Sequence, residues 1–433
     1  MAGAVNRVVD VLVIGAGPAG LAAAARLASA EGGRYRIEVL EREREAGGVP
    51  RHCAHGGFGL SDFGRPLDGP GYARRLARAA VRAGATLRTG VSATGWAGPL
   101  TLDVTAPAGL ERITARAVLL ATGARERPRS ARLVPGTRPA GVLTTGELQQ
   151  STHLYGVRRE RLGRRAVVIG AEPVAHHAVR VLRGARVDVV GMVTEQPRVP
   201  RRFGGPAQPP LLTGTTVAEL LGRGRLAGIR VRHADGRTGT IRCDTVVFTG
   251  DWIPDHELAR SGGVPLDSGT RGPAVDGAFR TASAGVFAAG DVLRGVEPAG
   301  AAAAEGRRAA DAVLRHLSGE PWPVSSVPLR SEDPVAWVAP NRVVGGATGG
   351  PFLVRVREPL TRPVVEVVQD GRVLHRTRLL GTAWPHRSVR LSAVWAREVD
   401  PAGGPVDVRV GPGNSRTRLS RQWPEPLADA PHR

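Results

Sequence analysis

The 433-residue sequence contains no lysine and only two cysteines, Cys53 and Cys243. Without lysine, the chain has no residue for a lysine Schiff base or a lysine general base. The two cysteines lie far apart, so they form no CxxC pair, no zinc-site spacing and no ligand set for an iron–sulfur cluster. Stabilisation by disulfides is not indicated either, which is typical of proteins of the reducing cytosol.

Long apolar runs are also missing. No stretch is both long and bulky enough to span a bilayer. The first apolar segment follows Met1 almost directly, which leaves no room for a signal peptide. We therefore expect a cytoplasmic protein without membrane insertion.

The charge balance is strongly basic, with a formal net charge of +21, and all 60 basic residues are arginine. Such a balance can indicate binding to nucleic acid. However, aromatic residues make up only 4% of the chain and do not alternate with arginine, as a single-strand-binding surface would need. Abundant Arg, Ala, Gly and Pro are instead typical of a GC-rich genome, and we expect no nucleic-acid partner.

A dinucleotide-binding pattern opens the chain. An apolar run at residues 8–14 is followed by a glycine-rich turn, a helix over 21–28 and a strand over 36–40 that ends at Glu41. In this pattern Gly15 allows a tight turn, Gly17 lets the backbone approach a pyrophosphate, and Gly20 lets the helix pack on the strand. The helix N-terminus then faces the phosphates, and Glu41 can accept hydrogen bonds from a ribose. The predicted turn consists of Gly15, Ala16, Gly17, Pro18, Ala19 and Gly20.

Two further motifs make the pattern specific. An apolar strand at 117–120 precedes Ala121-Thr122-Gly123, and residues 281–291 read TASAGVFAAGD. The latter resembles the second FAD fingerprint of the pyridine nucleotide-disulfide reductase superfamily. The resemblance implies that FAD is the cofactor and that Asp291 holds its ribityl chain. The remaining FAD contacts that we expect are Gly48, Val91, Thr122, Gly123, Gly290 and Ala299.

A second strand–turn–helix–strand unit lies between these motifs, with strands at 166–169 and 186–190 and a helix at 174–182. In the superfamily this inserted unit binds NAD(P)H. Here Glu172 stands where the second glycine belongs, and a carboxylate there would crowd and repel a pyrophosphate. We expect the fold to be kept while NAD(P) binding is in doubt. The alternative is that Glu172 points to solvent or caps the helix.

The segment 47–59 is expected to run past the flavin, with Arg51, His52 and Cys53 as flavin-proximal candidates for catalysis. Only one cysteine is present there, so a redox dithiol is excluded. Neighbouring Arg and His could lower the pKa of Cys53, or the thiol could be buried and inert. His52 and His55 alone supply two ligands, so no metal site is predicted.

Residues 50–59 (PRHCAHGGFG), 124–128 (ARERP) and 141–146 (GVLTTG) resemble a narrower group, the FAD/NAD(P)-binding subunits of opine oxidases and hydrogen cyanide synthase. This resemblance implies an amino-acid-oxidase-like partner subunit. The cysteine-rich [2Fe–2S] region of that group is absent here, so the resemblance adds a separate small [2Fe–2S] protein as a second expected partner.

The expected fold class is α/β: a doubly wound FAD-binding Rossmann-like domain with an inserted second Rossmann-like domain, plus a C-terminal β-sandwich-like domain. The FAD domain is assigned to residues 1–150 and 253–317, the insertion to 151–252, a Pro- and Ser-rich linker to 318–328, and the β-rich domain to 329–427. Short β-like runs and a hairpin signal at Gln369-Asp370-Gly371 support the last assignment. No FAD motif lies beyond residue 317, so FAD binding is expected to need nothing after it.

These features predict an FAD-dependent oxidoreductase, an electron-transferring subunit that works with an amine- or amino-acid-oxidising flavoprotein. One alternative is a stand-alone NAD(P)H-dependent reductase of a small carrier or quinone. Another is a redox-silent FAD-binding scaffold subunit.

Overall fold

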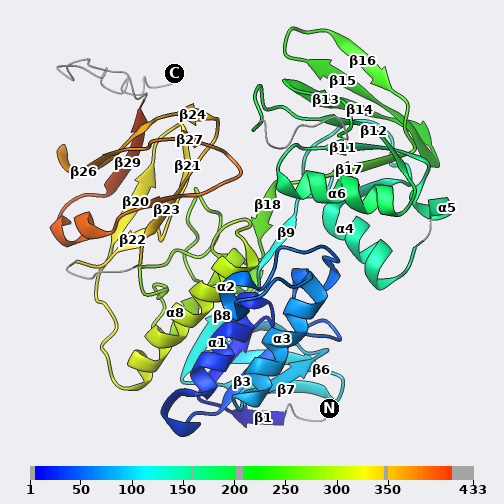
Figure 1. Cartoon of the computed structure of the whole chain (residues 1–433). Coiled ribbons are helices and arrows are strands. Elements are labelled where there is room, and N and C mark those ends of the chain that lie inside the picture. Colours follow the sequence, from blue (N-terminus) through cyan, green and yellow to red (C-terminus); the bar gives the residue numbers. More distant parts are fainter. Residues whose placement is uncertain (1–4, 158, 201–207, 346–349, 412–433) are drawn as a thin grey trace, which may run out of the picture.

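The computed structural model describes all residues except 1–4, 158, 201–207, 346–349 and 412–433. Three lobes are visible in Figure 1. The blue and cyan lobe, which is completed by the long helix α8 (Ala299–Leu317), contains most of both chain segments assigned to the FAD domain. The green lobe is inserted between those segments, and the yellow to red lobe is C-terminal.

A five-stranded parallel sheet forms the centre of the first lobe, in the order β19-β8-β2-β3-β4. All residues of β2, β3, β8 and β19 are buried, as expected for parallel strands that are covered on both faces. The helices α1, α3 and α8 pack in this lobe, and small residues let α1 and α8 approach closely. The bounds are β2 (Val11–Ile14), α1 (Pro18–Ala28), β3 (Ile37–Glu41), α3 (Gly69–Arg82), β4 (Thr86–Thr89), β8 (Ala117–Leu120) and β19 (Val286–Ala288).

The apolar run at residues 8–14 is two strands rather than the single strand that its composition predicts. The exposed strand β1 (Val5–Val8) pairs in parallel with β7 in a second sheet, and the chain then enters β2. Asp10 interrupts the run because its carboxylate accepts a hydrogen bond from the backbone of Arg36. The second sheet has the order β1-β7-β6-β5, with β5 (Ser92–Gly98), β6 (Thr101–Ala106) and β7 (Gly109–Thr114).

The inserted lobe has a five-stranded parallel sheet in the order β10-β17-β11-β12-β13, covered on one face by α4 and α6 and on the other by an antiparallel sheet of β14, β15 and β16. The predicted boundary at residue 150 is wrong, because β10 pairs with β17 of this sheet. The bounds are β10 (Val142–Thr144), α4 (Thr145–Gln149), α5 (Arg159–Leu162), β11 (Arg165–Ile169), α6 (Pro173–Gly184), β12 (Asp188–Val193), β13 (Leu211–Leu212), β14 (Thr215–Arg223), β15 (Arg225–His233), β16 (Thr238–Ile241) and β17 (Thr245–Phe248).

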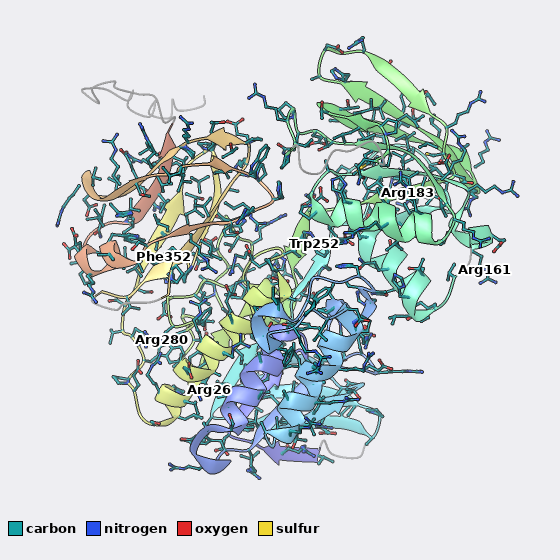
Figure 2. The ribbon with its side chains drawn as sticks, in the orientation of Figure 1. Arg26, Arg161, Arg183, Trp252, Arg280 and Phe352 are labelled. Carbon is teal, nitrogen blue, oxygen red and sulfur yellow. The ribbon has the colours of Figure 1, made fainter. Side chains whose placement is uncertain are left out.

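Two short antiparallel strands carry the chain into and out of this lobe: β9 (Ala124–Glu126) and β18 (Trp252–Pro254). Trp252 is labelled in Figure 2 where the three lobes meet. Because β9 follows the Ala-Thr-Gly motif directly, this two-stranded link begins next to the predicted FAD site.

The C-terminal lobe consists of β-sheets, as predicted. A five-stranded sheet has the order β22-β20-β29-β25-β26, a three-stranded sheet has the order β21-β23-β28, and residues of both sheets share one apolar core around the fully buried Trp395. The predicted hairpin is confirmed, since Gln369 pairs with Arg372 and both turn residues have positive φ. The predicted end at residue 427 lies outside the described residues. The bounds are β20 (Val327–Ser331), β21 (Val335–Ala339), β22 (Arg342–Val343), β23 (Phe352–Val356), β24 (Leu360–Thr361), β25 (Val364–Gln369), β26 (Arg372–Arg378), β27 (Thr382–Ala383), β28 (Val389–Leu391) and β29 (Val406–Gly411).

Among the helices that the structure describes, none is long and apolar enough to cross a membrane.

Candidate functional site

The glycine-rich turn between β2 and α1 has the geometry that dinucleotide binding requires. Gly15 has φ +104°, and a Cβ there would lie 2.3 Å from the carbonyl oxygen of Ala121. A Cβ on Gly20 would lie 1.9 Å from the carbonyl oxygen of Gly15, so this position allows the helix to pack on the turn. Around Gly17, by contrast, no heavy atom from elsewhere in the described chain lies within 4 Å of where a Cβ would be. The turn is therefore tight on its protein side and open on its outer side.

Glu41, at the end of β3, is buried and turned toward this loop. Its carboxylate accepts hydrogen bonds from the backbone N–H groups of Ala16 and Glu43, both at 3.0 Å. The backbone carbonyl of Glu41 also accepts the N–H of Val91 at 2.9 Å. The acid is thus held at the position from which the motif predicts contact with a ribose.

The remaining predicted FAD residues gather around the same turn. A Cβ on Gly48 would lie 2.9 Å from Cα of Gly17, and one on Gly290 would lie 2.7 Å from Cβ of Ala19. Thr122 donates to the carbonyl of Asp255 at 2.7 Å, which ties the Ala-Thr-Gly motif to the segment after β18. The other predicted positions are Gly123, with φ +80°, and Ala299, the first residue of α8.

Asp291 lies in the short 3-10 helix after β19, and its carboxylate accepts the N–H of Glu297 at 3.1 Å. Burial raises the pKa of Asp291 to about 7, while that hydrogen bond and nearby Arg294 oppose the rise. A carboxyl group with this pKa can accept a hydrogen bond from a ligand hydroxyl or, when protonated, donate one.

Several buried polar atoms of the FAD lobe and its junction with the insertion have no hydrogen-bond partner within the described structure. They include Nε of Arg51, Nδ1 of His52, Oε1 of Glu126 and the hydroxyl of Thr145, and also Nδ1 of His256, Nε of Arg294 and Nδ1 of His316. Buried polar groups are normally paired, so unpaired ones beside an open dinucleotide turn indicate a place for a polar ligand. The open cradle at Gly17, the acid at Glu41 and these unpaired atoms together fit FAD.

Cys53 is buried. The sequence left open whether its thiol has a lowered pKa or is buried and inert, and the structure favours the second. Its thiol lies 3.4 Å from both the carbonyl oxygen of Val49 and Oε1 of Gln149. Burial, with a smaller contribution from nearby Glu126, raises the pKa of Cys53 to about 12. The thiol is therefore protonated and not activated as a nucleophile.

His52 is also buried, and burial together with the adjacent Arg51 lowers the pKa of His52 to about 4. The imidazole is therefore neutral at physiological pH. Arg51 is anchored by the carbonyl of Glu45 and lies 3.8 Å from the carboxylate of Glu43. Both residues keep one unpaired nitrogen, and they remain the flavin-proximal candidates.

Glu126 on β9 is a candidate that the sequence did not reveal. One carboxylate oxygen accepts the N–H of Gly146 at 2.7 Å, while the other has no partner among the described residues. Burial raises the pKa of Glu126 to about 7. Its short ARERP context carries no signal for this role, because the hydrogen bond from Gly146 of α4 exists only in the folded chain.

Glu172 occupies the glycine-rich turn of the inserted lobe. Its carboxylate folds back, accepting the N–H of Ala171 at 2.9 Å and the hydroxyl of Thr249. Its side chain makes no capping hydrogen bond to α6, so the alternative that Glu172 caps this helix is wrong. A Cβ on Gly170 would lie within 2.9 Å of both oxygens of this carboxylate, so the anion fills the space beside the turn.

Two cavities of about 430 Å³ lie outside the glycine turn. One lies between the loop at residues 47–59 and the inserted lobe, where the rings of His55 and His177 stack with centroids 3.7 Å apart. This stack places His177 of α6 against the loop that carries His55. Burial, with His55 and Arg180 nearby, lowers the pKa of His177 to about 4.

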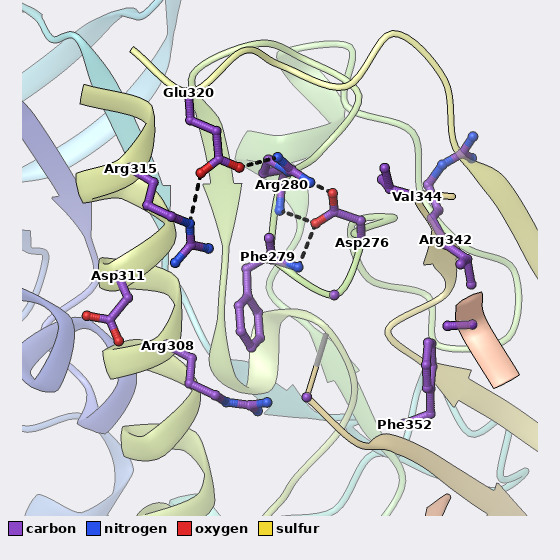
Figure 3. Close-up of a pocket in the computed structure, with 15 residues that line it drawn as sticks. Asp276, Phe279, Arg280, Arg308, Asp311, Arg315, Glu320, Arg342, Val344 and Phe352 are labelled. Atoms are coloured by element: carbon purple, nitrogen blue, oxygen red, sulfur yellow. Dashed lines mark hydrogen bonds and ion pairs between the residues drawn. The ribbon is translucent and has the colours of Figure 1, made fainter. Parts of the chain in front are cut away.

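The other cavity lies between α8 and the C-terminal lobe, and Figure 3 shows its lining. Arg280 links Asp276 and Glu320, and Arg315 pairs with Glu320, so much of the charge in its wall is already compensated. Arg308 extends over the ring of Phe279, with the guanidinium carbon 5.0 Å from the ring centroid. This cavity is separate from the glycine turn.

Within the described residues, no group of three or more His, Cys, Asp or Glu side chains is arranged to hold a metal ion.

Comparison with known proteins agrees with this geometry. The family model described as pyridine nucleotide-disulphide oxidoreductase matches residues 9–306. The alpha chain of sarcosine oxidase from Rhizobium meliloti (strain 1021) is 31% identical over 379 residues, covering 84% of this chain and 36% of that protein. An opine oxidase subunit of Agrobacterium tumefaciens (strain Ach5) is 30% identical over 365 residues, covering 74% of this chain and 68% of that protein.

Among solved structures, the thioredoxin reductase of T. acidophilum is similar with a TM-score of 0.59 and 23% identity, covering 72% of this chain and 100% of that chain. The L-proline dehydrogenase of P. horikoshii has a TM-score of 0.54 and 20% identity, covering 74% of this chain and 58% of that chain. These structures show the shared fold.

The fold and the site define an FAD-dependent oxidoreductase. The chain belongs to the pyridine nucleotide-disulphide oxidoreductase family. It spans about a third of the length of the sarcosine oxidase relative and about two thirds of the opine oxidase relative that it matches.

Proposed function

We propose that this chain is an electron-transferring subunit that works with an amine- or amino-acid-oxidising flavoprotein. The observation that carries the proposal is the contrast between its two glycine turns. The first is open at Gly17, whereas the second contains the carboxylate of Glu172. The first turn suits a bound dinucleotide, and the second is occupied by an anion of the chain itself.

In this proposal Gly17 and the N-terminus of α1 hold the pyrophosphate of FAD, Glu41 its ribose and Asp291 its ribityl chain. Bound FAD would supply the redox chemistry, while the protein positions it and sets its electrostatic surroundings. Arg51, His52 and Glu126 each keep a buried polar atom without a partner in the described structure, and in this proposal these atoms would hydrogen-bond the flavin. The neutral imidazole of His52 and the carboxyl of Glu126 are the groups able to hold a proton there.

The charge on Glu172 disfavours NAD(P)H as the electron source. Two like charges about 4 Å apart repel by roughly 4 kcal/mol at an intermediate dielectric constant. Its carboxylate also uses the N–H of Ala171, which a phosphate would otherwise accept. Electrons would then have to come from a partner.

The names of the relatives support a partner of the proposed kind, because both are subunits of oxidases, of sarcosine and of opines. Cys53 and Cys243 are both buried and unpaired in the structure, so this chain cannot ligate an iron–sulfur cluster with four thiolates. A small [2Fe–2S] protein is therefore the second partner in the proposal.

A stand-alone NAD(P)H-dependent reductase is the second candidate function. The retained unit of β11, α6 and β12, with φ +134° at Gly170, favours it. If the side chain of Glu172 rotated away from Ala171, the turn would open. A redox-silent scaffold subunit would need only the first glycine turn, the one proposed to bind FAD.

The proposed function is tested by anaerobic titration of the FAD-loaded protein with a panel of amines and amino acids, with and without the oxidising flavoprotein. The expected result is bleaching of the flavin of this chain only when the flavoprotein is present. Bleaching by a substrate in the absence of that flavoprotein would contradict the proposal that the partner oxidises the substrate. No bleaching under either condition would favour the redox-silent scaffold subunit.

A further inference from the structure

The C-terminal lobe contacts the FAD lobe through an arginine whose side chain is largely buried. Arg355, on β23, lies with its guanidinium 4.8 Å from the ring centroid of Trp337. The same guanidinium donates to the carbonyls of Gly295 and Val296, both at 3.4 Å, and to the carboxylate of Glu297 at 2.7 Å. Three consecutive residues between β19 and α8 are therefore bound by a single side chain from the C-terminal lobe.

Ser388 reinforces this contact from the same lobe. Its hydroxyl donates to the carboxylate oxygen of Glu297 that Arg355 also binds, and it accepts a hydrogen bond from Arg355 at 2.9 Å. The side chains of Arg355 and Glu297 are only 14% and 10% exposed, so this ion pair is shielded from water. Hydrogen bonds between charged groups are among the stronger ones in proteins, and shielding from solvent strengthens them.

The bound segment contacts Asp291 directly. The N–H of Glu297 donates to Oδ1 of Asp291 at 3.1 Å, so a shift of Glu297 would move a hydrogen-bond donor away from that carboxyl group. On its other side the segment is held by Arg294, which pairs with Glu305 of α8 and lies 5.8 Å from the Trp337 ring centroid. Trp337 thus stacks beside two arginines, one from each lobe.

The segment also carries backbone strain. Val296 has φ +28°, a region that β-branched residues rarely adopt. Gly295 lies so close to Trp252 that a Cβ would be 2.7 Å from the Cβ of that tryptophan, which Figure 2 shows at the junction of the lobes. A strained conformation persists only when its surroundings hold it, and Arg355 is the side chain that binds the carbonyl of Val296.

We propose that the C-terminal β lobe completes the FAD site, and that Arg355 is the positioning residue through which it fixes Asp291. The inference rests on the proposed role of Asp291 in holding FAD. It reverses the expectation from the sequence that FAD binding needs nothing beyond residue 317. In this proposal the C-terminal lobe contributes directly to FAD binding.

The test is the affinity of the deflavinated full-length chain for FAD in the variants Arg355→Gln and Arg357→Gln. Arg357 is a matched control because it is 61% exposed and pairs with Asp333 at the surface. We expect Arg355→Gln to raise the dissociation constant of FAD by roughly tenfold or more, since a charged hydrogen bond is lost. Arg357→Gln should change it by less than about twofold. Equal affinity in wild type and Arg355→Gln would overturn the proposal.

A double-mutant cycle with Asp291→Asn separates positioning from general support of the fold. If Arg355 acts through Asp291, Arg355→Gln should have little further effect on FAD affinity in the Asp291→Asn background. A full, additive loss in that background would contradict the proposed route. If Arg355→Gln does not fold, Ser388→Ala takes its place, with an expected loss of about threefold. An unchanged FAD affinity in Ser388→Ala would then count against the proposal.

Failure of this inference and failure of the proposed function give different results. If the wild-type chain binds no FAD, the cofactor assignment itself is wrong. If the wild type binds FAD and Asp291→Asn weakens binding, but Arg355→Gln and Ser388→Ala do not, only the role of the C-terminal lobe is overturned.

Discussion

Glu126 of β9 is a buried acid, and its ionisation should be visible in the stability of the whole protein. Its pKa is raised by burial from 4.5 to about 7, so the folded protein holds a proton that the unfolded chain releases. The contribution of Glu126 to the free energy of unfolding should therefore fall by about 3 kcal/mol as pH rises from about 4.5 to 7. His52 and His177, whose pKa values are lowered by burial, contribute in the opposite direction. Denaturant unfolding at pH 4.5 and pH 7 should show that Glu126→Gln loses less stability over this window, or gains more, than wild type.

The variant keeps the contribution of Asp291 to the pH dependence of stability, because the pKa of Asp291 is raised in the same direction. Glu358→Gln, at an exposed position, is the control and should leave the slope unchanged. If Glu126→Gln had the same pH dependence of stability as wild type and Glu358→Gln, Glu126 would not be a buried acid.

Glu172 is the second residue whose charge has a direct consequence. Replacing it with glycine removes the carboxylate from the N–H of Ala171 and restores the glycine that the dinucleotide pattern calls for. Binding of NADH to Glu172→Gly should be at least about tenfold tighter than to wild type, since about 1.4 kcal/mol of relieved repulsion suffices for that factor. Equilibrium titration by NADH fluorescence measures it.

Glu219, a partly exposed residue of β14, pairs with Arg230 of β15; Glu219→Gln removes one negative charge from the same lobe and serves as the control. It should leave NADH binding unchanged. Equal, weak binding in wild type and Glu172→Gly would mean that the nicotinamide pocket is lost more widely than at this one residue.

At the scale of elements, the contact between α1 and α8 should be the most sensitive to added volume. A Cβ on Gly306 of α8 would lie 2.0 Å from the carbonyl oxygen of Ala19, which is backbone and cannot rotate away. Gly306→Ala should lower the free energy of unfolding by about 1–3 kcal/mol and weaken FAD retention, because it displaces the N-terminus of α1. Chemical denaturation and the flavin content of the purified variant measure both effects.

Gly184, at the end of α6, is the matched control, because in the described structure nothing lies within 4 Å of where its Cβ would be. Gly184→Ala should be neutral or stabilising by up to about 1 kcal/mol. Destabilisation by both substitutions alike would mean that the close packing of α8 on α1 is not the cause.

Short-range patterns in the sequence predicted those elements whose signals are local. The glycine turn, the parallel strand β8 and the hairpin of β25 and β26 each follow from a few adjacent residues, and the structure contains them. The first boundary of the insertion was placed too late because β10 lies within the GVLTTG motif at 141–146, and no linker separates this motif from the FAD segment. Its pairing with β17 joins segments that lie about a hundred residues apart in the sequence.

The same reasoning explains which parts of the site could not be predicted. Glu126 becomes notable only when α4 packs beside it, and Arg355 lies far along the chain from the segment that it binds. The direction in which Glu172 points depends on Thr249, which directly follows β17 and lies 77 residues further along the chain. Motifs specify the residue types of a turn, whereas contacts between distant segments require the folded chain.

At the scale of the whole molecule, three lobes meet around the segment between Asp291 and α8. The FAD lobe supplies Arg294 and Glu305, the C-terminal lobe supplies Arg355 and Trp337, and Trp252 of β18 lies on the path to the insertion. The FAD lobe and the C-terminal lobe contact this segment through side chains, and the link to the insertion contacts it through Trp252, so all three can influence the proposed cofactor site. The central claim for the whole molecule is that its electrons do not come from NAD(P)H.

That claim is tested most directly by mixing the FAD-loaded wild-type protein anaerobically with NADH and with NADPH in a stopped-flow instrument, while following flavin absorbance. Because the carboxylate of Glu172 fills the second glycine turn, we predict that the flavin stays oxidised, or is reduced only slowly and without saturation. Rapid reduction that saturates at micromolar NADH or NADPH would contradict the account and establish the chain as a stand-alone NAD(P)H-dependent reductase.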